Sequence, residues 1–222
     1  MTENPQQRWF LECWQQREDK VYPSLFGDLG QGVHTATAEH FARLKQKAQH
    51  PGWLHHGVFA CPPSGDRQHW CYVTSGLSNP WNLDKPEPDP SGFSGCGFEL
   101  CLCTPAASDW AIAVLHHLMA WQLLVAVEAV QGQPLGVGQR VPLGGAIDGR
   151  RDGEMTWVVV EQPDQFEPSF ELPSGKVDWL QLCGVTDSEV EFARKNSQGD
   201  LLKRLRKQAI WPVSDPARQA TS

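Results

Sequence analysis

The sequence predicts an α+β fold, in which a mixed, mostly antiparallel sheet carries packed helices within a single domain. Segments with strand patterns outnumber helical ones, and hairpin-like strand pairs alternate with helical excursions, an order typical of this class. The chain has 222 residues, and its ten Trp and nine Phe supply the apolar material for a sizeable core. The segments expected in the sheet are residues 55–61, 69–75, 97–103, 155–160 and 177–183.

Two helices are expected before the first of these strands. The first begins within residues 8–30, where apolar side chains are spaced for one helical face until Pro23 ends the helix. The second covers residues 36–49, where apolar side chains follow one stripe and Pro51 marks the end. The apolar positions are Trp9, Cys13 and Trp14 in the first helix, and Ala38, Phe41, Leu44 and Ala48 in the second.

Three strands and a long loop follow. Residues 55–61 and 69–75 have strand composition, and the turn-rich segment 62–68 joins them. Residues 78–95 contain four closely spaced prolines, which predict a long surface loop. Residues 97–103 alternate between two faces of a strand. One face carries Phe98, Leu100 and Leu102, and the other carries Glu99, Cys101 and Cys103.

The longest apolar run predicts a helix over residues 109–131. Ser108 can cap its start, and Gly132 followed by Pro134 would end it. The run approaches the length of a membrane span, but polar side chains interrupt it, so we expect a core helix. The interrupting side chains are those of His116, His117, Gln122 and Glu128.

The C-terminal third combines strands with a capped helix. Thr186 and Glu189 match a capping box, in which each side chain satisfies a backbone amide at the other's position. The helix that they start is expected to break near residues 196–199 and then to resume, and the end of the chain after Pro212 is expected to fray. Strand patterns occur at residues 141–147, 155–160 and 176–185.

The charge and the cysteines limit the class of partner and the compartment. A net charge of −7 argues against nucleic acid or a membrane surface as the main partner and leaves a cationic partner open. The first residues lack a basic segment followed by an apolar stretch, so no secretory signal is predicted. We therefore expect a cytoplasmic protein with reduced thiols. No motif indicates a cofactor.

Three stretches of the chain are distinctive when they are taken in order: HWCYVTSGLSN (69–79), SGCGFELCLCTP (94–105) and KVDWLQLCGVTDSEVEFA (176–193). Together they resemble the suppressor of fused (SUFU-like) domain family, and the chain is similar to its single-domain bacterial type. The resemblance spans roughly residues 30–210. It implies an N-terminal helical extension at residues 1–29, a SUFU-like domain at 30–211 and a flexible tail at 212–222.

The resemblance implies a non-enzymatic domain that binds another protein. Animal members hold a transcription factor by strand addition between two domains, and this chain resembles only the first of them, so that ligand does not carry over. Single-domain bacterial members are associated with toxin systems, where they look like immunity proteins. The implied function is therefore an immunity or regulatory protein whose partner is a protein such as a cognate toxin.

Two other function classes stay open. A hydrolase would need a Cys nucleophile beside a His base, and with seven Cys and eight His such a pair is expected by chance. A metal-binding structural module would use Cys96, Cys101 and Cys103, but no second cysteine pair with zinc spacing is present, which favours buried thiols. Each adjacent histidine pair is expected to have one packed and one surface member. These pairs are His55–His56 and His116–His117.

The partner is expected to contact the proline-rich loop. Aromatic anchors within a charged rim are typical of protein interfaces. The residues with this character are Trp81, Asp84, Glu87, Asp89 and Phe93. Glu99 is a further candidate, because a carboxylate in its strand must reach solvent or be hydrogen-bonded. A structural contact to the preceding loop is the favoured interpretation of Glu99, and a contact to the partner is the alternative.

Overall fold

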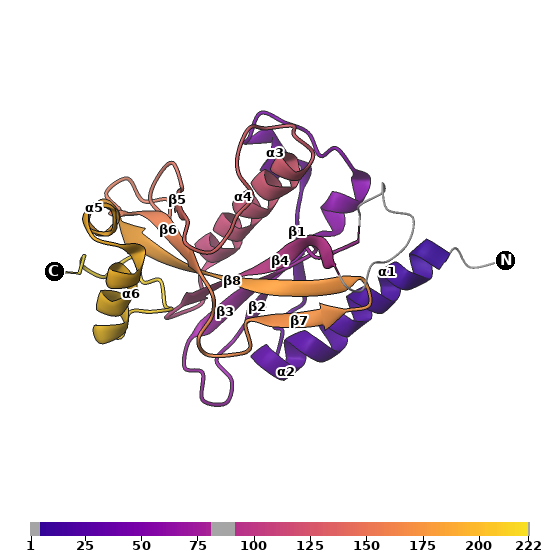
Figure 1. Ribbon diagram of the computed structural model, residues 1–222, viewed down its shortest axis with the longest axis horizontal. Helices are drawn as coiled ribbons and strands as arrows, with labels where there is room; N and C mark the ends of the chain where they lie inside the picture. The colour runs from indigo at the N-terminus through magenta and orange to yellow at the C-terminus, as the bar shows by residue number, and fades with distance from the viewer. Residues whose placement is uncertain (1–4, 81–91, 222) are drawn as a thin grey trace.

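The computed structural model describes residues 5–80 and 92–221, which form an eight-stranded sheet with helices on both faces (Figure 1). The strand order is β1-β2-β3-β4-β8-β6-β5, and β7 pairs with β8 beside this path. The strands are β1 Val33–Thr35, β2 Gly57–Cys61, β3 Trp70–Ser75, β4 Phe93–Thr104, β5 Arg140–Pro142, β6 Met155–Glu161, β7 Ser169–Leu172 and β8 Gly175–Thr186. The predicted α+β class is confirmed, and all five expected strands belong to the sheet.

The centre of the sheet is the parallel pair of β4 and β8, and the other ladders are antiparallel. Leu100 lies opposite Leu180 and Leu102 opposite Leu182 in this pair. The twelve residues of β8 are long enough to pair with β7 at the start of the strand and with β6 at its end. β8 therefore joins the two ends of the molecule.

The helix α4, Asp109–Ala126, covers one face of the sheet. Its Leu115 and Leu118 belong to the same buried cluster as Leu100 and Leu102 of β4, which confirms the expected packing and alternation. The helix ends earlier than residue 131, because Glu128 takes a positive φ of 58° that breaks the helical path. α4 is long and apolar enough to cross a membrane by length and composition, but here it is largely buried in the protein core.

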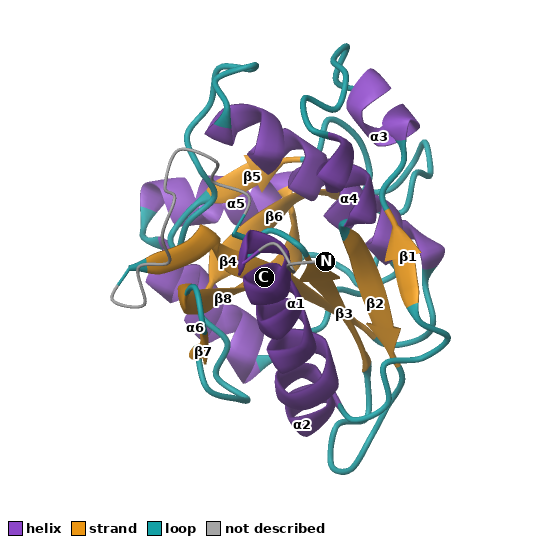
Figure 2. Ribbon diagram, turned by 90° about the vertical axis from the view of Figure 1, so that its right-hand side faces the viewer, coloured by secondary structure: helices purple, strands orange, loops and turns teal. Residues whose placement is uncertain are grey.

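The opposite face is covered by the N-terminal helical segment and by the C-terminal helices (Figures 1 and 2). The N-terminal segment consists of α1, Pro5–Gln15, the π-helix η1, Gln16–Val21, and α2, Tyr22–Phe26. At the other end, α5, Asp187–Lys195, and α6, Gln198–Lys207, pack on β6 and β8. The capping box and the interruption after α5 are both as predicted.

The π-helix changes which side chains of the N-terminal segment are buried. The buried positions Cys13, Arg17, Tyr22 and Phe26 are separated by four, five and four residues, and the step of five spans the π turn. Trp14, predicted to share the buried face with Cys13, is instead 43% exposed. Pro23 lies in the first turn of α2 and does not end the segment, since a missing N–H is tolerated there.

Two short helices lie near the far edge of the sheet. They are α3, Ala38–Ala42, and the 3₁₀ helix η2, Pro51–His55. The helix predicted over residues 36–49 is therefore much shorter, because Lys45 adopts a left-handed φ of 57°. Phe41 of α3 stacks on Trp53 of η2 with ring centroids 5.7 Å apart, which places both elements in the core beside α4.

The residues after Pro212 are anchored, and this differs from the expected flexible tail. The amide of Ser214 donates to the carbonyl of Cys103 at 2.8 Å, and the Ser214 hydroxyl accepts from the Gly184 amide. Arg218 forms a buried ion pair with Glu189 at 2.7 Å. Because Glu189 also caps α5, the tail closes over the start of that helix.

Candidate functional site

A buried polar network occupies the place where β3 and β4 separate. The ladder between them ends at the pair Val73 and Cys101. Beyond it, the amide of Leu100 donates to the side-chain oxygen of Thr74 at 2.8 Å. The chain then leaves β3 as the turn 76–79, and segment 81–91 begins directly after this turn. The polar network is formed by Arg17, Glu18, Tyr22, Thr74, Ser75, Gly76, Ser78, Asn79, Ser94 and Glu99.

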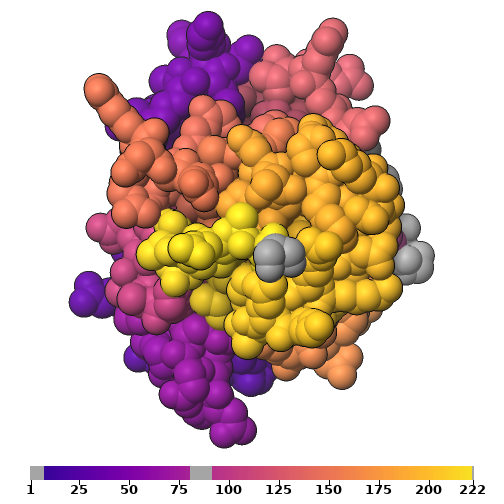
Figure 3. All heavy atoms as spheres, turned by 90° about the vertical axis from the view of Figure 1, so that its left-hand side faces the viewer, coloured from indigo at the N-terminus to yellow at the C-terminus, as the bar shows by residue number. Residues whose placement is uncertain are grey.

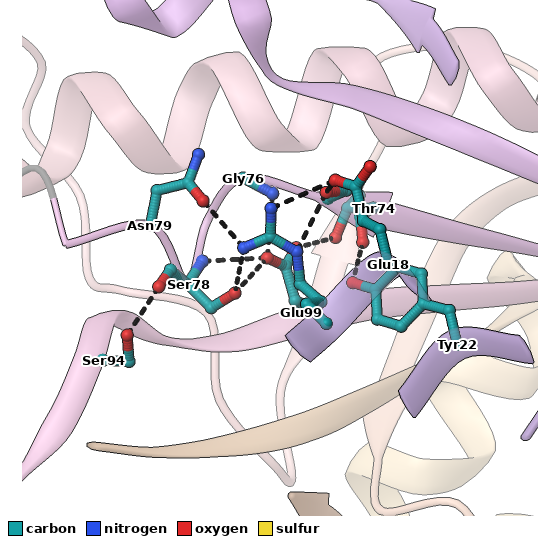
Figure 4. A network of polar contacts seen from close by, with 10 residues as sticks. Glu18, Tyr22, Thr74, Gly76, Ser78, Asn79, Ser94 and Glu99 are labelled. Atoms are coloured by element: carbon teal, nitrogen blue, oxygen red, sulfur yellow. Dashed lines mark hydrogen bonds and ion pairs between the residues drawn. The ribbon is translucent and has the colours of Figure 1, made fainter. Parts of the chain in front are cut away.

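Glu99 is the acceptor at the centre of the polar network (Figure 4). Its carboxylate accepts from the Thr74 hydroxyl at 2.6 Å, from the amides of Gly76 and Ser78 at 2.9 Å each, and from the Ser78 hydroxyl at 2.6 Å. The side chain has no exposed surface. Glu99 therefore fixes the turn from inside the protein, and in this structure it presents no surface to a partner.

Arg17 brings the N-terminal helical segment into the same network. Its guanidinium is 1% exposed and donates to the hydroxyls of Ser75 and Ser78 at 3.0 and 3.1 Å and to the side-chain carbonyl of Asn79 at 2.7 Å. It also forms an ion pair with Glu18 at 3.2 Å. Ser78 thus accepts a hydrogen bond from Arg17 and donates one to Glu99, so it links the π-helix η1 to strand β4.

Both flanks of segment 81–91 are held together. The hydroxyl of Ser94 donates to the carbonyl of Ser78 at 2.6 Å, and the amide of Cys96 donates to the carbonyl of Leu77 at 2.7 Å. Gly95, with φ of 57°, allows the close approach, because a Cβ there would lie 2.4 Å from the Leu77 carbonyl oxygen. The predicted surface loop 78–95 is therefore shorter than expected, because β4 already begins at Phe93, and Ser78, Asn79 and Ser94 are buried instead of exposed.

Exposed apolar side chains lie at the end of the molecule that holds the polar network. Phe93 is 61% exposed at the start of β4, and Leu11 and Trp14 of α1 are 39% and 43% exposed. Cys13 of α1 and Ser94 of β4 both hydrogen-bond to the Ser174 hydroxyl, which places Trp14 and Phe93 at the same end of the molecule. We name Leu11, Trp14 and Phe93 the apolar rim. The other predicted contacts, Trp81, Asp84, Glu87 and Asp89, lie outside the described residues.

The sequence did not indicate Arg17 or the part it plays. Arg17 shares the buried face with Cys13, Tyr22 and Phe26 at spacings of four, five and four residues. The sequence predicts this face only if a π turn is allowed in the helix. The strand alternation did place Glu99 on the face opposite Leu100 and Leu102. The favoured structural interpretation of Glu99 agrees with its bonds to residues 76–78.

His56 packs against Gly76 of the polar network and makes the stability of the protein depend on pH. Burial, with Arg17 nearby, lowers the pKa of His56 to about 3 from its usual 6.5. As the pH falls below 6.5, the unfolded chain takes up a proton that the folded chain does not, so stability is lost as the solution becomes acidic. We expect this histidine to cost about 3 kcal/mol of unfolding free energy between pH 6.5 and pH 4.

The measurement for His56 is urea unfolding across this pH range. The variant His56→Gln is expected to lose stability less steeply than the parent, by close to one proton in the pH slope. Equal slopes for the two proteins would show that another group carries the dependence. The preceding residue, His55, is exposed, so His55→Gln is the matched control. The pH dependence of its stability should have the same slope as that of the parent.

The thiols are distributed through the core. Six of the seven cysteines are buried, and Cys96 is half-buried. Burial raises the pKa of Cys96 and of Cys183 to about 12, which keeps these thiols protonated and works against a cysteine nucleophile. Cys101 and Cys103 lie on the α2 face of the sheet, whereas Cys96 packs against the α4 core. Within residues 5–80 and 92–221, no three His, Cys, Asp or Glu side chains are placed to hold a metal ion.

The histidine pairs follow the expected division. His56 and His116 are 0% and 5% exposed, while His55 is exposed and His117 is half-buried. His116 is held by a hydrogen bond of 2.8 Å between its Nε2 and the carbonyl of His34. The His40 ring packs against it in a tilted arrangement, with the ring centroids 4.3 Å apart. These contacts join β1, α3 and α4, so His116 has a structural role.

The family model described as "Suppressor of fused protein (SUFU)" matches residues 52–219. The chain belongs to the SUFU family. The match includes the turn 76–79, Ser94 and Glu99, and it begins after the N-terminal segment that supplies Arg17. A search of curated protein sequences gives no match.

Solved structures share the fold. A chain of the crystal structure of the Sufu–Fu complex superposes with a TM-score of 0.68 at 21% identity, over 95% of this chain and 92% of that one. Drosophila Suppressor of Fused gives 0.59 at 22% identity, over 75% of this SUFU chain and 42% of the fly protein. A SUFU homologue from Neisseria gonorrhoeae gives 0.52 at 17% identity, over 75% and 78%.

The SUFU family is one of binding and regulatory proteins, and the first of these structures contains Sufu in complex with the protein Fu. The fold, with helices on both faces of the sheet, is therefore shared with a chain of the Sufu–Fu complex over 95% of this chain.

Proposed function

We propose that this SUFU-family chain is a non-enzymatic protein-binding module whose partner docks at the apolar rim and contacts acidic residues of the sequence segment 81–91. The observation that carries the proposal is Phe93, a large aromatic side chain left 61% exposed next to Ser94, which is buried and hydrogen-bonded to the Ser78 carbonyl. Large aromatic residues on a rigid support are typical centres of protein interfaces. Membership of a family of binding proteins supports the same function.

The geometry suits binding because the polar network holds the residues on both sides of segment 81–91 in a fixed arrangement. Arg17 and Glu99 hold the turn before segment 81–91, and Ser94 holds the residues after it. A site that is already ordered loses less conformational entropy when the partner arrives. The polar network therefore contributes to affinity without touching the partner.

We further propose that the partner is a basic protein, such as a cognate toxin that this chain neutralises in the cytoplasm. The net charge of −7 favours a cationic partner. Asp84, Glu87 and Asp89 precede Phe93 in the sequence and supply acidic side chains for contact with such a partner. Opposite charge speeds association chiefly at low ionic strength.

The test begins with the protein that co-purifies with the chain at native levels. The triple variant D84S/E87S/D89S is expected to associate with that partner more slowly, by about tenfold at low salt, and to show a flatter salt dependence. Stopped-flow or surface-based association rates across a salt series give both quantities. The control D66S/D152S/E154S removes the same charge from exposed positions elsewhere and should retain the parental salt dependence.

An association rate and salt slope that are unchanged in D84S/E87S/D89S would remove these carboxylates from the interface. A uniform loss in both triple variants would instead show that only the net charge matters. Co-purification with an acidic protein would contradict the basic partner while leaving the binding function in place.

A further inference from the structure

The end of the molecule opposite the apolar rim carries a basic surface on an acidic protein. Residues 194–207 contain six of the nineteen Lys and Arg but only one acidic residue, Asp200, so this segment has a net charge of +5 while the rest of the chain has −12. The segment comprises the end of α5 and all of α6, which lie at the end away from α1 (Figure 1). Figure 3 shows these helices as a continuous outer face.

Aromatic rings hold three of these arginines in place. The guanidinium of Arg204 lies 3.5 Å from the ring centroid of Phe192, that of Arg206 lies 5.3 Å from Trp211, and that of Arg194 lies 5.5 Å from Trp157. A stacked guanidinium keeps its planar fork of N–H donors in a fixed orientation. We name Arg194, Lys195, Lys203, Arg204, Arg206 and Lys207 the basic face.

The protein itself shows how this face receives a carboxylate. Asp164 accepts from Arg206 Nε at 2.9 Å through one oxygen and from Trp211 Nε1 at 3.0 Å through the other. Arg194 and Lys203 are also paired, with Glu191 and Asp200. These pairs are half-exposed, and exposed pairs contribute little to stability, so an incoming carboxylate can exchange with them at little cost.

We infer that the basic face binds an acidic, carboxylate-rich peptide segment of a protein, at a site separate from the apolar rim. Guanidinium forks match the two oxygens of Asp and Glu side chains. The charge of −12 on the rest of the chain repels a long polyanion or an anionic membrane, whereas a short acidic segment contacts the basic face alone. Two sites at opposite ends would let the domain join a basic partner to an acidic one.

The test uses a fluorescein-labelled oligoglutamate peptide and fluorescence anisotropy. We expect saturable binding that weakens with salt and is weakened about tenfold in K195Q/K203Q/K207Q, because three cationic contacts are lost. Gln retains helix propensity, so α6 should remain folded. The control K20Q/K45Q/K47Q removes the same charge from exposed lysines elsewhere and should bind as the parent does. R204K, which keeps the charge but removes the fork, should bind several-fold more weakly.

The inference is overturned if oligoglutamate does not bind saturably, or if both triple-lysine variants lose affinity equally. Tighter binding of single-stranded DNA or of phosphatidylserine vesicles than of oligoglutamate would also overturn it, since the ligand would then be a phosphate polymer or a lipid surface. Self-association abolished by K195Q/K203Q/K207Q in sedimentation velocity would identify the occupant as a second copy of this chain. All of these variants leave the apolar rim intact, so failure here is distinguishable from failure of the proposed function.

Discussion

Glu99→Leu is expected to lower the free energy of unfolding by about 3–5 kcal/mol, which is a large share of the stability of a typical domain. The substitution removes the acceptor for the amides of Gly76 and Ser78 and for the hydroxyls of Thr74 and Ser78. All four donors would lose their acceptor in a site with no exposed surface, which is costly.

Urea unfolding measures the effect of Glu99→Leu. Glu99→Gln, which retains one acceptor oxygen, should lose about half as much and keeps the prediction testable if the Leu variant does not fold. The control Glu39→Gln breaks an exposed ion pair with Arg43 and should change stability by less than about 0.5 kcal/mol. Equal stabilities for Glu99→Gln and Glu39→Gln would contradict a structural role for the carboxylate.

Arg17→Met is expected to cost about 3–5 kcal/mol and to loosen the N-terminal helical segment together with the turn 76–79. The methionine fills part of the volume but leaves Ser75, Ser78 and Asn79 without their donor and leaves Glu18 without its countercharge. The matched control is Arg8→Met, since Arg8 forms only an exposed pair with Glu12 in α1.

Hydrogen exchange locates the change in Arg17→Met. The amides of residues 5–26 and of Gly76 and Ser78 should exchange faster, while those of β6 and α5 should keep their protection. A global loss of protection without a local one would show that Arg17 supports the fold in general. Unchanged protection at Gly76 and Ser78 would show that Arg17 does not stabilise the turn 76–79.

The sheet could be predicted because its strands carry periodic patterns. The alternation of residues 97–103 and the capping box at Thr186 depend only on neighbouring side chains, so they are visible in the sequence. β1 and β7 were not predicted, since three or four residues that are mostly exposed or half-buried give no alternation to detect. The helix over residues 36–49 was overestimated because the left-handed Lys45 leaves no signal in the sequence.

The candidate site was predicted only in part, because its geometry depends on contacts between distant residues. Glu99 and Phe93 were identified individually, as a carboxylate in a strand and an aromatic side chain beside a loop. Arg17 lies 58 residues from Ser75 in sequence, and its burial follows from the π turn that rotates it toward the sheet. No local pattern specifies such a contact.

The central claim is that this SUFU-family chain acts by binding a protein at the apolar rim, and isothermal titration of the co-purified partner tests it most directly. Phe93→Ser is expected to weaken the affinity by about a hundredfold, the usual cost of losing an aromatic anchor. Val137→Ser, at a position 51% exposed outside the rim, should change it by less than about threefold. Equal affinities of the parent, Phe93→Ser and Val137→Ser would contradict the claim.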